Sequence, residues 1–153
     1  MNDLLQVFLF AMTPICEMTG SIPMGIAAFK LPAWQVFLVS LLGNSLIPIF
    51  VLNFLEIITE FLSKHFAFFK KIINWLFERT RKQYTKNFEI YKSLALFMIA
   101  VLPFPFAGTW TASLCAFLFN VPFKRAVFLI FAGNSIAALV LTLVTLGIIN
   151  VHI

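Results

Sequence analysis

The chain has 153 residues, of which 61% are hydrophobic and 11% are charged, and its formal net charge is +5. A soluble domain of this size has much surface for its volume and needs more polar side chains than this chain contains. Disordered and fibrous proteins are excluded by the same composition. Most basic residues lie in one stretch beside strongly apolar segments, which indicates a membrane surface rather than a nucleic-acid partner. The composition therefore predicts an integral protein of the cell membrane.

Four apolar stretches follow one another, each long enough to cross a hydrocarbon core of about 30 Å: residues 4–29, 33–56, 93–119 and 123–149. Two of them are interrupted by helix breakers, which are Pro14, Gly20 and Pro23 in the first and Pro103, Pro105 and Gly108 in the third. Each interrupted stretch divides into two helical arms of about ten residues, or about 15 Å, which is half a bilayer. The second and fourth stretches are predicted to be transmembrane helices.

Residues 57–92 form a polar linker that carries most of the lysine and arginine residues. Because basic residues are enriched in cytoplasmic loops, this linker is predicted to be cytoplasmic. Its first part is amphipathic, and its apolar helical face consists of Phe61, Leu62, His65, Phe66, Phe69, Ile72, Ile73, Leu76 and Phe77. Such a helix is expected to lie on the inner leaflet, and a helix packed on a soluble partner is the alternative.

An internal repeat is the strongest signal in the sequence. In the first half, residues 29–32 (FKLP) precede residues 43–45 (GNS), which begin eleven residues after the proline. In the second half, residues 119–122 (FNVP) precede residues 133–135 (GNS) at the same distance. The matching upstream positions are Ala11 with Ala100, Pro14 with Pro103, and residues 19–21 with residues 107–109. Each half is therefore predicted to be a broken hairpin followed by one transmembrane helix: residues 4–30 and 33–56, then residues 93–120 and 123–149.

Two membrane topologies fit this repeat. If the broken segments are re-entrant and turn back at mid-depth, the repeat is inverted and both termini lie outside the cytoplasm. Ten basic residues are then inside and only Lys30 is outside. If the broken segments cross the membrane instead, the repeat is parallel and Lys124 and Arg125 lie outside. Eight basic residues are then inside and three are outside. The positive-inside rule favours the inverted, re-entrant topology.

Glu17 is the only carboxylate deep in an apolar segment, and it lies at the first break, where a hairpin tip is predicted. A charged group at that depth is costly, and intramembrane ionisable residues commonly serve a function. We therefore expect Glu17 to bind and release a proton or a cation. The alternative is a structural carboxylate that is protonated or paired with Lys30 or Arg125.

Asn44 and Asn134 follow the prolines that begin their helices by a rise of about 17 Å along the helix axis. They are therefore expected near the middle of the membrane. With Glu17 they are predicted to form a substrate and proton site, because secondary transporters bind substrates at that depth. The hydroxyl groups assigned to the same site are Thr19, Ser21, Thr109 and Thr111. The alternative is that these small and polar residues only let helices pack closely and hydrogen-bond.

The remaining polar residues point to no catalytic chemistry. Lys124 and Arg125 are candidates for holding a lipid headgroup or a substrate anion, or for anchoring the topology. Trp110 is interpreted as a packing residue of the hairpin. Both histidines lie outside the predicted spans and neither cysteine has a CxxC partner, so no metal site, cofactor or disulfide framework is expected. No catalytic triad or phosphate loop is present, and the chain is not expected to be an enzyme.

The chain resembles the putative small multi-drug export protein family over nearly its whole length. The segments that carry the resemblance are residues 14–25 (PICEMTGSIPMG), Gly43-Asn44 and residues 103–111 (PFPFAGTWT). That family typically shows Glu-x-Arg-Gly-x-Ile-Pro in the first half and Pro-Leu-Pro-Gly-Thr-Gly-Ala-Trp-Thr in the second. This chain departs from it at Thr19, where arginine is usual, and at Phe106, where glycine is usual. The resemblance extends remotely to the DedA-like membrane proteins, and it implies opposed re-entrant hairpins and flipping of a lipid carrier.

The sequence thus favours an all-α membrane transporter that exports a small lipophilic or amphipathic compound, coupled to protons through Glu17. Its expected partners are membrane lipid and the small-molecule substrate, and two full spans per chain are compatible with a homodimer. One alternative is a flippase for a phosphorylated lipid carrier, with Arg125 or Lys124 holding the headgroup. A second alternative is a structural membrane protein or channel subunit that transports nothing.

Overall fold

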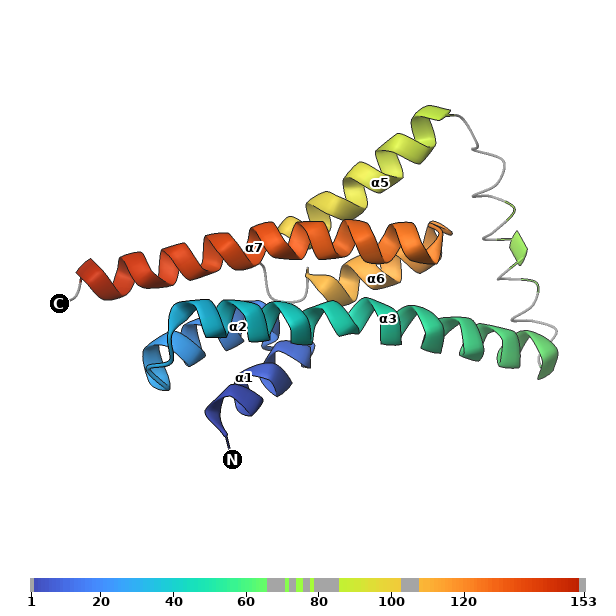
Figure 1. The fold of residues 1–153 in the computed structure, drawn as a ribbon. Helices are drawn as coiled ribbons and strands as arrows, with labels where there is room; N and C mark the ends of the chain where they lie inside the picture. Colours follow the sequence, from blue (N-terminus) through green and yellow to red (C-terminus); the bar gives the residue numbers. More distant parts are fainter. Residues whose placement is uncertain are drawn as a thin grey trace.

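The computed structural model describes residues 2–65, 71, 74–75, 78, 86–102 and 108–151. Every regular element in these residues is helical (Figure 1). In chain order the helices are α1 (Asp3–Met12), α2 (Glu17–Pro23), the π-helix η1 (Met24–Ala28), α3 (Ala33–His65), α5 (Lys86–Val101), α6 (Thr109–Leu118) and α7 (Phe123–Val151). The predicted all-α class is confirmed for this part of the chain.

The first apolar stretch is broken between α1 and α2, at residues 13–16. Pro14 lies in this break, as predicted. Gly20 and Pro23, in contrast, lie inside α2 rather than at a tip. Pro23 lacks the N–H that an α-helix needs, and the helix widens into η1 directly after it, which is one way a helix accommodates a proline.

The two long helices, α3 and α7, pack against each other and run in opposite directions (Figure 1). They are the described helices that are long and apolar enough to cross a membrane. α7 begins at Phe123, as predicted, whereas α3 continues beyond the predicted end at residue 56 to His65. Likewise α5 begins at Lys86, inside the stretch predicted as linker.

Each long helix is preceded by the same backbone turn. Lys30, two residues before Pro32, has a φ of 52°, and Asn120, two residues before Pro122, has a φ of 50°. Both angles lie in the left-handed region, which few side chains adopt without cost. The chain therefore enters α3 and α7 through matching turns.

The contacts of the two long helices also match. A Cβ on Gly43 of α3 would lie 2.8 Å from the backbone oxygen of Phe8 and 3.3 Å from the Cβ of Ala11, both in α1. A Cβ on Gly133 of α7 would lie 2.7 Å from the Cβ of Ala100 in α5. Glycine thus lets a short helix approach each long helix closely, as is common in membrane proteins.

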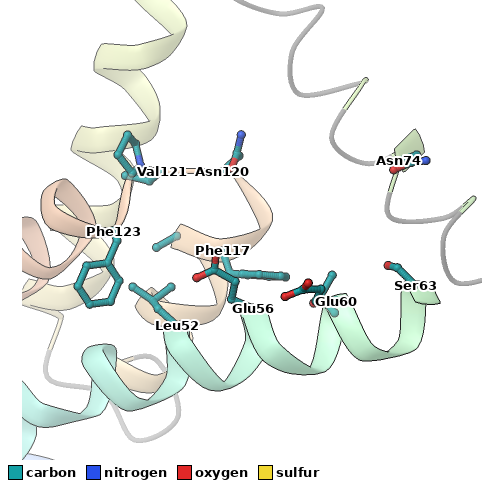
Figure 2. A pocket seen from close by; sticks show the side chains of 12 residues that line it. Leu52, Glu56, Glu60, Ser63, Asn74, Phe117, Asn120, Val121 and Phe123 are labelled. Carbon is teal, nitrogen blue, oxygen red and sulfur yellow. The ribbon is translucent and has the colours of Figure 1, made fainter. Parts of the chain in front are cut away.

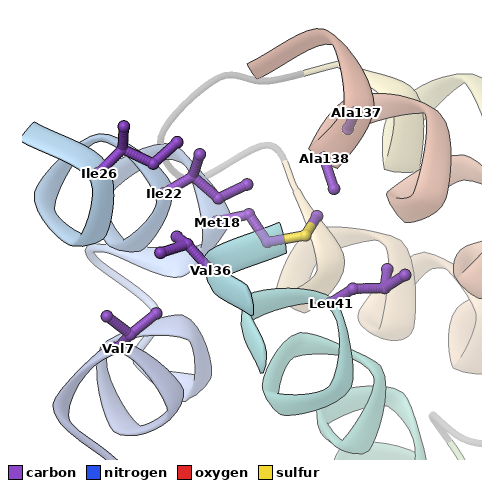
Figure 3. Packing of buried hydrophobic residues seen from close by; sticks show 8 residues of the cluster. All are labelled: Val7, Met18, Ile22, Ile26, Val36, Leu41, Ala137 and Ala138. Atoms are coloured by element: carbon purple, nitrogen blue, oxygen red, sulfur yellow. The ribbon is translucent and has the colours of Figure 1, made fainter. Parts of the chain in front are cut away.

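The buried apolar residues form two clusters. One joins α1, α2, α3 and α7 (Figure 3) and contains Val7, Met18, Ile22, Ile26, Val36, Leu41, Ala137 and Ala138. The second cluster joins α5, α6 and α7 with Leu52 of α3. Large apolar side chains such as Phe50, Phe128 and Leu143 are nevertheless exposed. Two helices long and apolar enough to cross a membrane, together with these exposed apolar side chains, support a membrane location.

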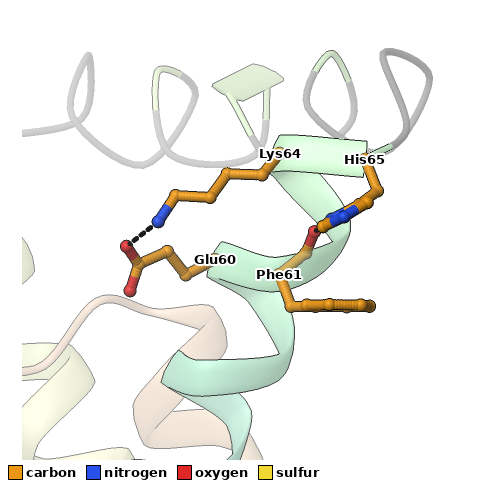
Figure 4. A network of polar contacts seen from close by, with 4 residues as sticks. All are labelled: Glu60, Phe61, Lys64 and His65. Atoms are coloured by element: carbon orange, nitrogen blue, oxygen red, sulfur yellow. Dashed lines mark hydrogen bonds and ion pairs between the residues drawn. The ribbon is translucent and has the colours of Figure 1, made fainter.

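The predicted amphipathic helix falls mostly on residues outside those described. Its described beginning is the end of α3, where Lys64 donates a hydrogen bond of 2.8 Å to Glu60 and the rings of Phe61 and His65 stack at 4.3 Å (Figure 4). This ion pair is solvent-exposed, and such pairs contribute little to stability. The predicted tip residues Pro103 and Pro105 also lie outside the described residues.

Candidate functional site

Glu17 lies at the start of α2 and is 4% exposed. Its carboxylate faces the N-terminus of α6, where the backbone N–H of Trp110 donates a hydrogen bond of 3.4 Å to Oε1. A helix N-terminus carries unpaired N–H groups and a partial positive charge, so it stabilises an anion. The first broken stretch therefore places an acid on a helix end of the second.

Gly108 makes this contact possible. A Cβ at residue 108 would lie 1.9 Å from Oε2 of Glu17, far inside van der Waals contact. The carboxylate thus occupies the space that any side chain at this position would need. Within the described residues Glu17 has no ion-pair partner, so the alternative pairing with Lys30 or Arg125 is not found.

A second polar contact joins three helices beside Glu17. The side-chain amide of Asn44 in α3 donates to Oγ1 of Thr109 in α6 at 2.8 Å. The Thr109 hydroxyl in turn donates to Oδ1 of Asn134 in α7 at 3.1 Å. All three side chains are fully buried. The two asparagines that the sequence places at corresponding positions therefore meet at one hydroxyl.

This network leaves hydrogen-bonding capacity in the interior. Oδ1 of Asn44, Nδ2 of Asn134 and Nε1 of Trp110 are buried without a hydrogen-bond partner. A buried polar atom without a partner is costly, so such atoms are often found where a ligand or water binds. A cavity of about 10 Å³ lies here, lined by Glu17, Thr19, Thr109 and Asn134 among others. That volume is about what one water molecule needs.

The other predicted site hydroxyls, Thr19, Ser21 and Thr111, differ in their surroundings. Thr19 lines the small cavity, but its hydroxyl donates to the backbone oxygen of Cys16 at 2.9 Å. Ser21 is buried and donates to Ser40 at 3.0 Å rather than to either asparagine. Thr111 follows Thr109 by two residues in α6, so it points to a different face of that helix.

Lys124 and Arg125 are exposed in the first turn of α7. The structure places neither of them among the residues that line the small cavity. A headgroup or anion held by these two side chains would therefore lie apart from Glu17.

Sequence reasoning missed two features of the site and one buried lysine outside it. Ser40 partners Ser21, and its position four residues before Asn44, on the same helical face, was the available signal. The backbone of Trp110 binds Glu17, which no side-chain pattern encodes. Lys92 was assigned to the linker, yet it is 4% exposed and donates to the backbone oxygen of Phe119 at 3.4 Å.

Chemically, the arrangement can hold a proton on Glu17 and offer both a donor and an acceptor from the asparagines. Among the described residues no three His, Cys, Asp or Glu side chains are grouped so that they could hold a metal ion.

Comparison with known proteins identifies the family. No match is found among curated proteins or among solved structures. A relationship to the DedA-like proteins is not among these findings. The sequence model of the family described as "Putative small multi-drug export protein" matches residues 17–140, which is well over half of the chain. Because this match begins at Glu17 and includes Asn44, Thr109 and Asn134, it covers the whole candidate site, and the chain belongs to this family.

Proposed function

We propose that this membrane protein is a proton-coupled exporter of small amphipathic compounds, and that Glu17 exchanges a proton for the substrate. The observation that carries the proposal is the position of the Glu17 carboxylate, buried at the N-terminus of α6 beside Asn134. Burial favours the neutral acid, whereas the helix N-terminus favours the carboxylate. A site balanced in this way can change protonation when its surroundings change.

The proposal includes an inverted repeat with two re-entrant hairpins and a cytoplasmic linker. The opposite directions of α3 and α7, the matching turns at Lys30 and Asn120, and the matching glycine contacts support it. α1 has 10 residues, which is about 15 Å and too short to span a bilayer. Thr13, Pro14 and Ile15 at the break between α1 and α2 are exposed, so the proposal requires protein or water to cover this backbone in the membrane.

The depth of the site follows from the long helices. Asn44 lies twelve residues after Pro32, and Asn134 lies twelve after Pro122. At about 1.5 Å per residue, each asparagine is about 18 Å along its helix, near the bilayer midplane. Transporters of the inverted-repeat type bind their substrates at this depth.

Transport requires the site to open, because a cavity of about 10 Å³ holds no drug-sized compound. The Glu17 contact with Gly108 and Trp110 joins the two broken stretches. We expect separation of these stretches to admit substrate, and the proton on Glu17 to decide which arrangement is favoured. A lipid-carrier flippase using Lys124 or Arg125 has no observation in its favour beyond the exposure of these side chains.

The test is flux of a fluorescent lipophilic cation in liposomes with an imposed pH gradient. The native chain is compared with Glu17→Gln, and Glu78→Gln, at an exposed position in the linker, is the matched control. Flux that needs both the gradient and Glu17, and that survives in the control, supports the proposal. Equal flux in the native chain and Glu17→Gln would overturn it, and absence of flux in all folded variants would direct attention to lipid-phosphate flipping.

A further inference from the structure

A second, larger cavity lies between the end of α3, the turn that joins α6 to α7, and Asn74 of the linker (Figure 2). Its volume is about 580 Å³, within the range of about 300–1,000 Å³ that is typical of small-molecule sites. The lining residues used here are Leu52, Glu56, Thr59, Glu60, Phe117 and Phe123. None of them belongs to the site around Glu17.

The lining combines negative charge with apolar surface. Glu56 and Glu60 are one turn apart in α3, and in Figure 2 their side chains lie between α3 and the α6–α7 turn. Glu60 is paired with Lys64, whereas Glu56 has no hydrogen-bond or ion-pair partner among the described residues. No lysine or arginine is among the described residues that line the cavity. An unpaired carboxylate next to Phe117 and Phe123 suits a ligand that is both cationic and apolar.

The corresponding end of α7 is built differently. On the proposed repeat, in which Pro32 matches Pro122, the counterparts of Glu56 and Glu60 are Leu146 and Asn150. Leu146 packs against the same apolar cluster as Phe29. The residues that the repeat matches to Glu56 and Glu60 are therefore uncharged.

The position of the cavity also fits a binding step. Glu56 lies twelve residues beyond Asn44, which is about 18 Å along α3 and places it at the membrane interface. α3 continues from there into the basic linker, which is predicted to be cytoplasmic. At this depth a lipophilic cation collects, because its apolar part enters the lipid and its charge stays near water.

We propose that this cavity is an inner vestibule that binds monovalent amphipathic organic cations, with Glu56 opposite the positive charge and Phe117 and Phe123 against the apolar body. The cytoplasmic orientation and the onward transfer toward Glu17 rest on the proposed function. The binding site itself rests on the cavity and its lining.

The experiment measures binding of tetraphenylphosphonium to the full-length chain in lipid nanodiscs by equilibrium dialysis, with protein-free nanodiscs subtracted. Glu56→Gln is expected to weaken binding about twofold to fivefold, the size expected for losing one solvated ion pair. Glu78→Gln is the matched exposed control and should bind as the native chain does. Tetraphenylborate, which has a similar apolar body and the opposite charge, should bind the native chain more weakly than the phosphonium ion after the same subtraction.

A second variant protects the test against a folding defect. Thr59→Lys places a positive charge in the lining and should also weaken binding of the cation. Unchanged affinity in both Glu56→Gln and Thr59→Lys would overturn the proposal, as would equal affinity for the cation and the anion. Glu17→Gln separates this inference from the proposed function. If binding depends on Glu56 but flux does not depend on Glu17, the vestibule is supported and proton-coupled export is contradicted.

Discussion

The two broken stretches contribute different chemistry to one site. The first supplies an acid, because α2 begins at Glu17 and buries its carboxylate. The second supplies N–H groups and a hydroxyl, because α6 begins directly after Gly108 and exposes Thr109 and Trp110 to that acid. The comparison teaches that the two halves contribute different groups to one site, an acid from the first and hydrogen-bond donors from the second.

The hydroxyls at matched positions show a similar difference. Ser21 and Thr109 each follow a glycine that the repeat places at the same position. Thr109 contacts Asn44 and Asn134, one from each long helix. Among the described residues the Ser21 hydroxyl donates to Ser40, which lies within its own half. The second broken stretch therefore joins the halves, whereas the hydroxyl of the first stretch does not.

Gly108→Ala should have the largest effect on this arrangement. The added Cβ would lie 1.9 Å from Glu17 Oε2, so the carboxylate or α6 must move. We expect a loss of about 2–3 kcal/mol in the free energy of unfolding, as for overpacking in an interior. Thermal unfolding in detergent measures it.

Gly147→Ala in α7 is the matched control, because a Cβ there meets nothing within 4 Å. It should leave stability unchanged or raise it slightly, since alanine is the better helix former. Equal melting temperatures for the two variants would show that the close contact between residue 108 and Glu17 does not exist.

Thr109→Val should have the next largest effect. It removes the hydroxyl that serves both asparagines and leaves their buried amides with fewer partners, at a cost of about 1–2 kcal/mol. Ser21→Ala removes the single bond to Ser40 and should cost about 1 kcal/mol or less. Unfolding in detergent ranks the two, and a larger loss for Ser21→Ala would reverse the comparison between the stretches.

The smallest expected effect concerns the turns before the long helices. Glycine adopts a left-handed φ without steric cost, so Lys30→Gly should stabilise the chain by about 0.5–1 kcal/mol. Asn120→Gly should gain less, because asparagine tolerates this conformation better than lysine. A gain at residue 120 that exceeds the gain at residue 30 would mean that the two turns are not alike.

Much of the fold could be predicted from the sequence, because hydrophobic runs and prolines determine it locally. The break at Pro14 and the start of α7 at Phe123 follow from proline chemistry. Asn44 and Asn134 both contact Thr109. Their equal distance from a preceding proline indicates that they lie at the same depth. The helical state of Gly20 and Pro23 could not be predicted, because a change to π-helical geometry absorbs the missing N–H.

The partner of Glu17 could not be predicted for a different reason. Sequence patterns indicate which side chains can interact, but the partners of Glu17 are backbone N–H groups, which every residue except proline carries. Only the end of a helix leaves such groups unpaired, and the place where α6 begins relative to Glu17 depends on tertiary packing.

Proton release on substrate binding tests the central claim most directly. Purified protein in weakly buffered detergent solution is mixed with tetraphenylphosphonium, and a pH indicator records the protons released for each bound cation. If Glu17 exchanges its proton for the cation, the native chain releases up to about one proton per cation and Glu17→Gln releases none. Equal proton release from the native chain and Glu17→Gln would contradict the account. So would saturable binding of the cation to the native chain without proton release, at a pH at which Glu17 is protonated.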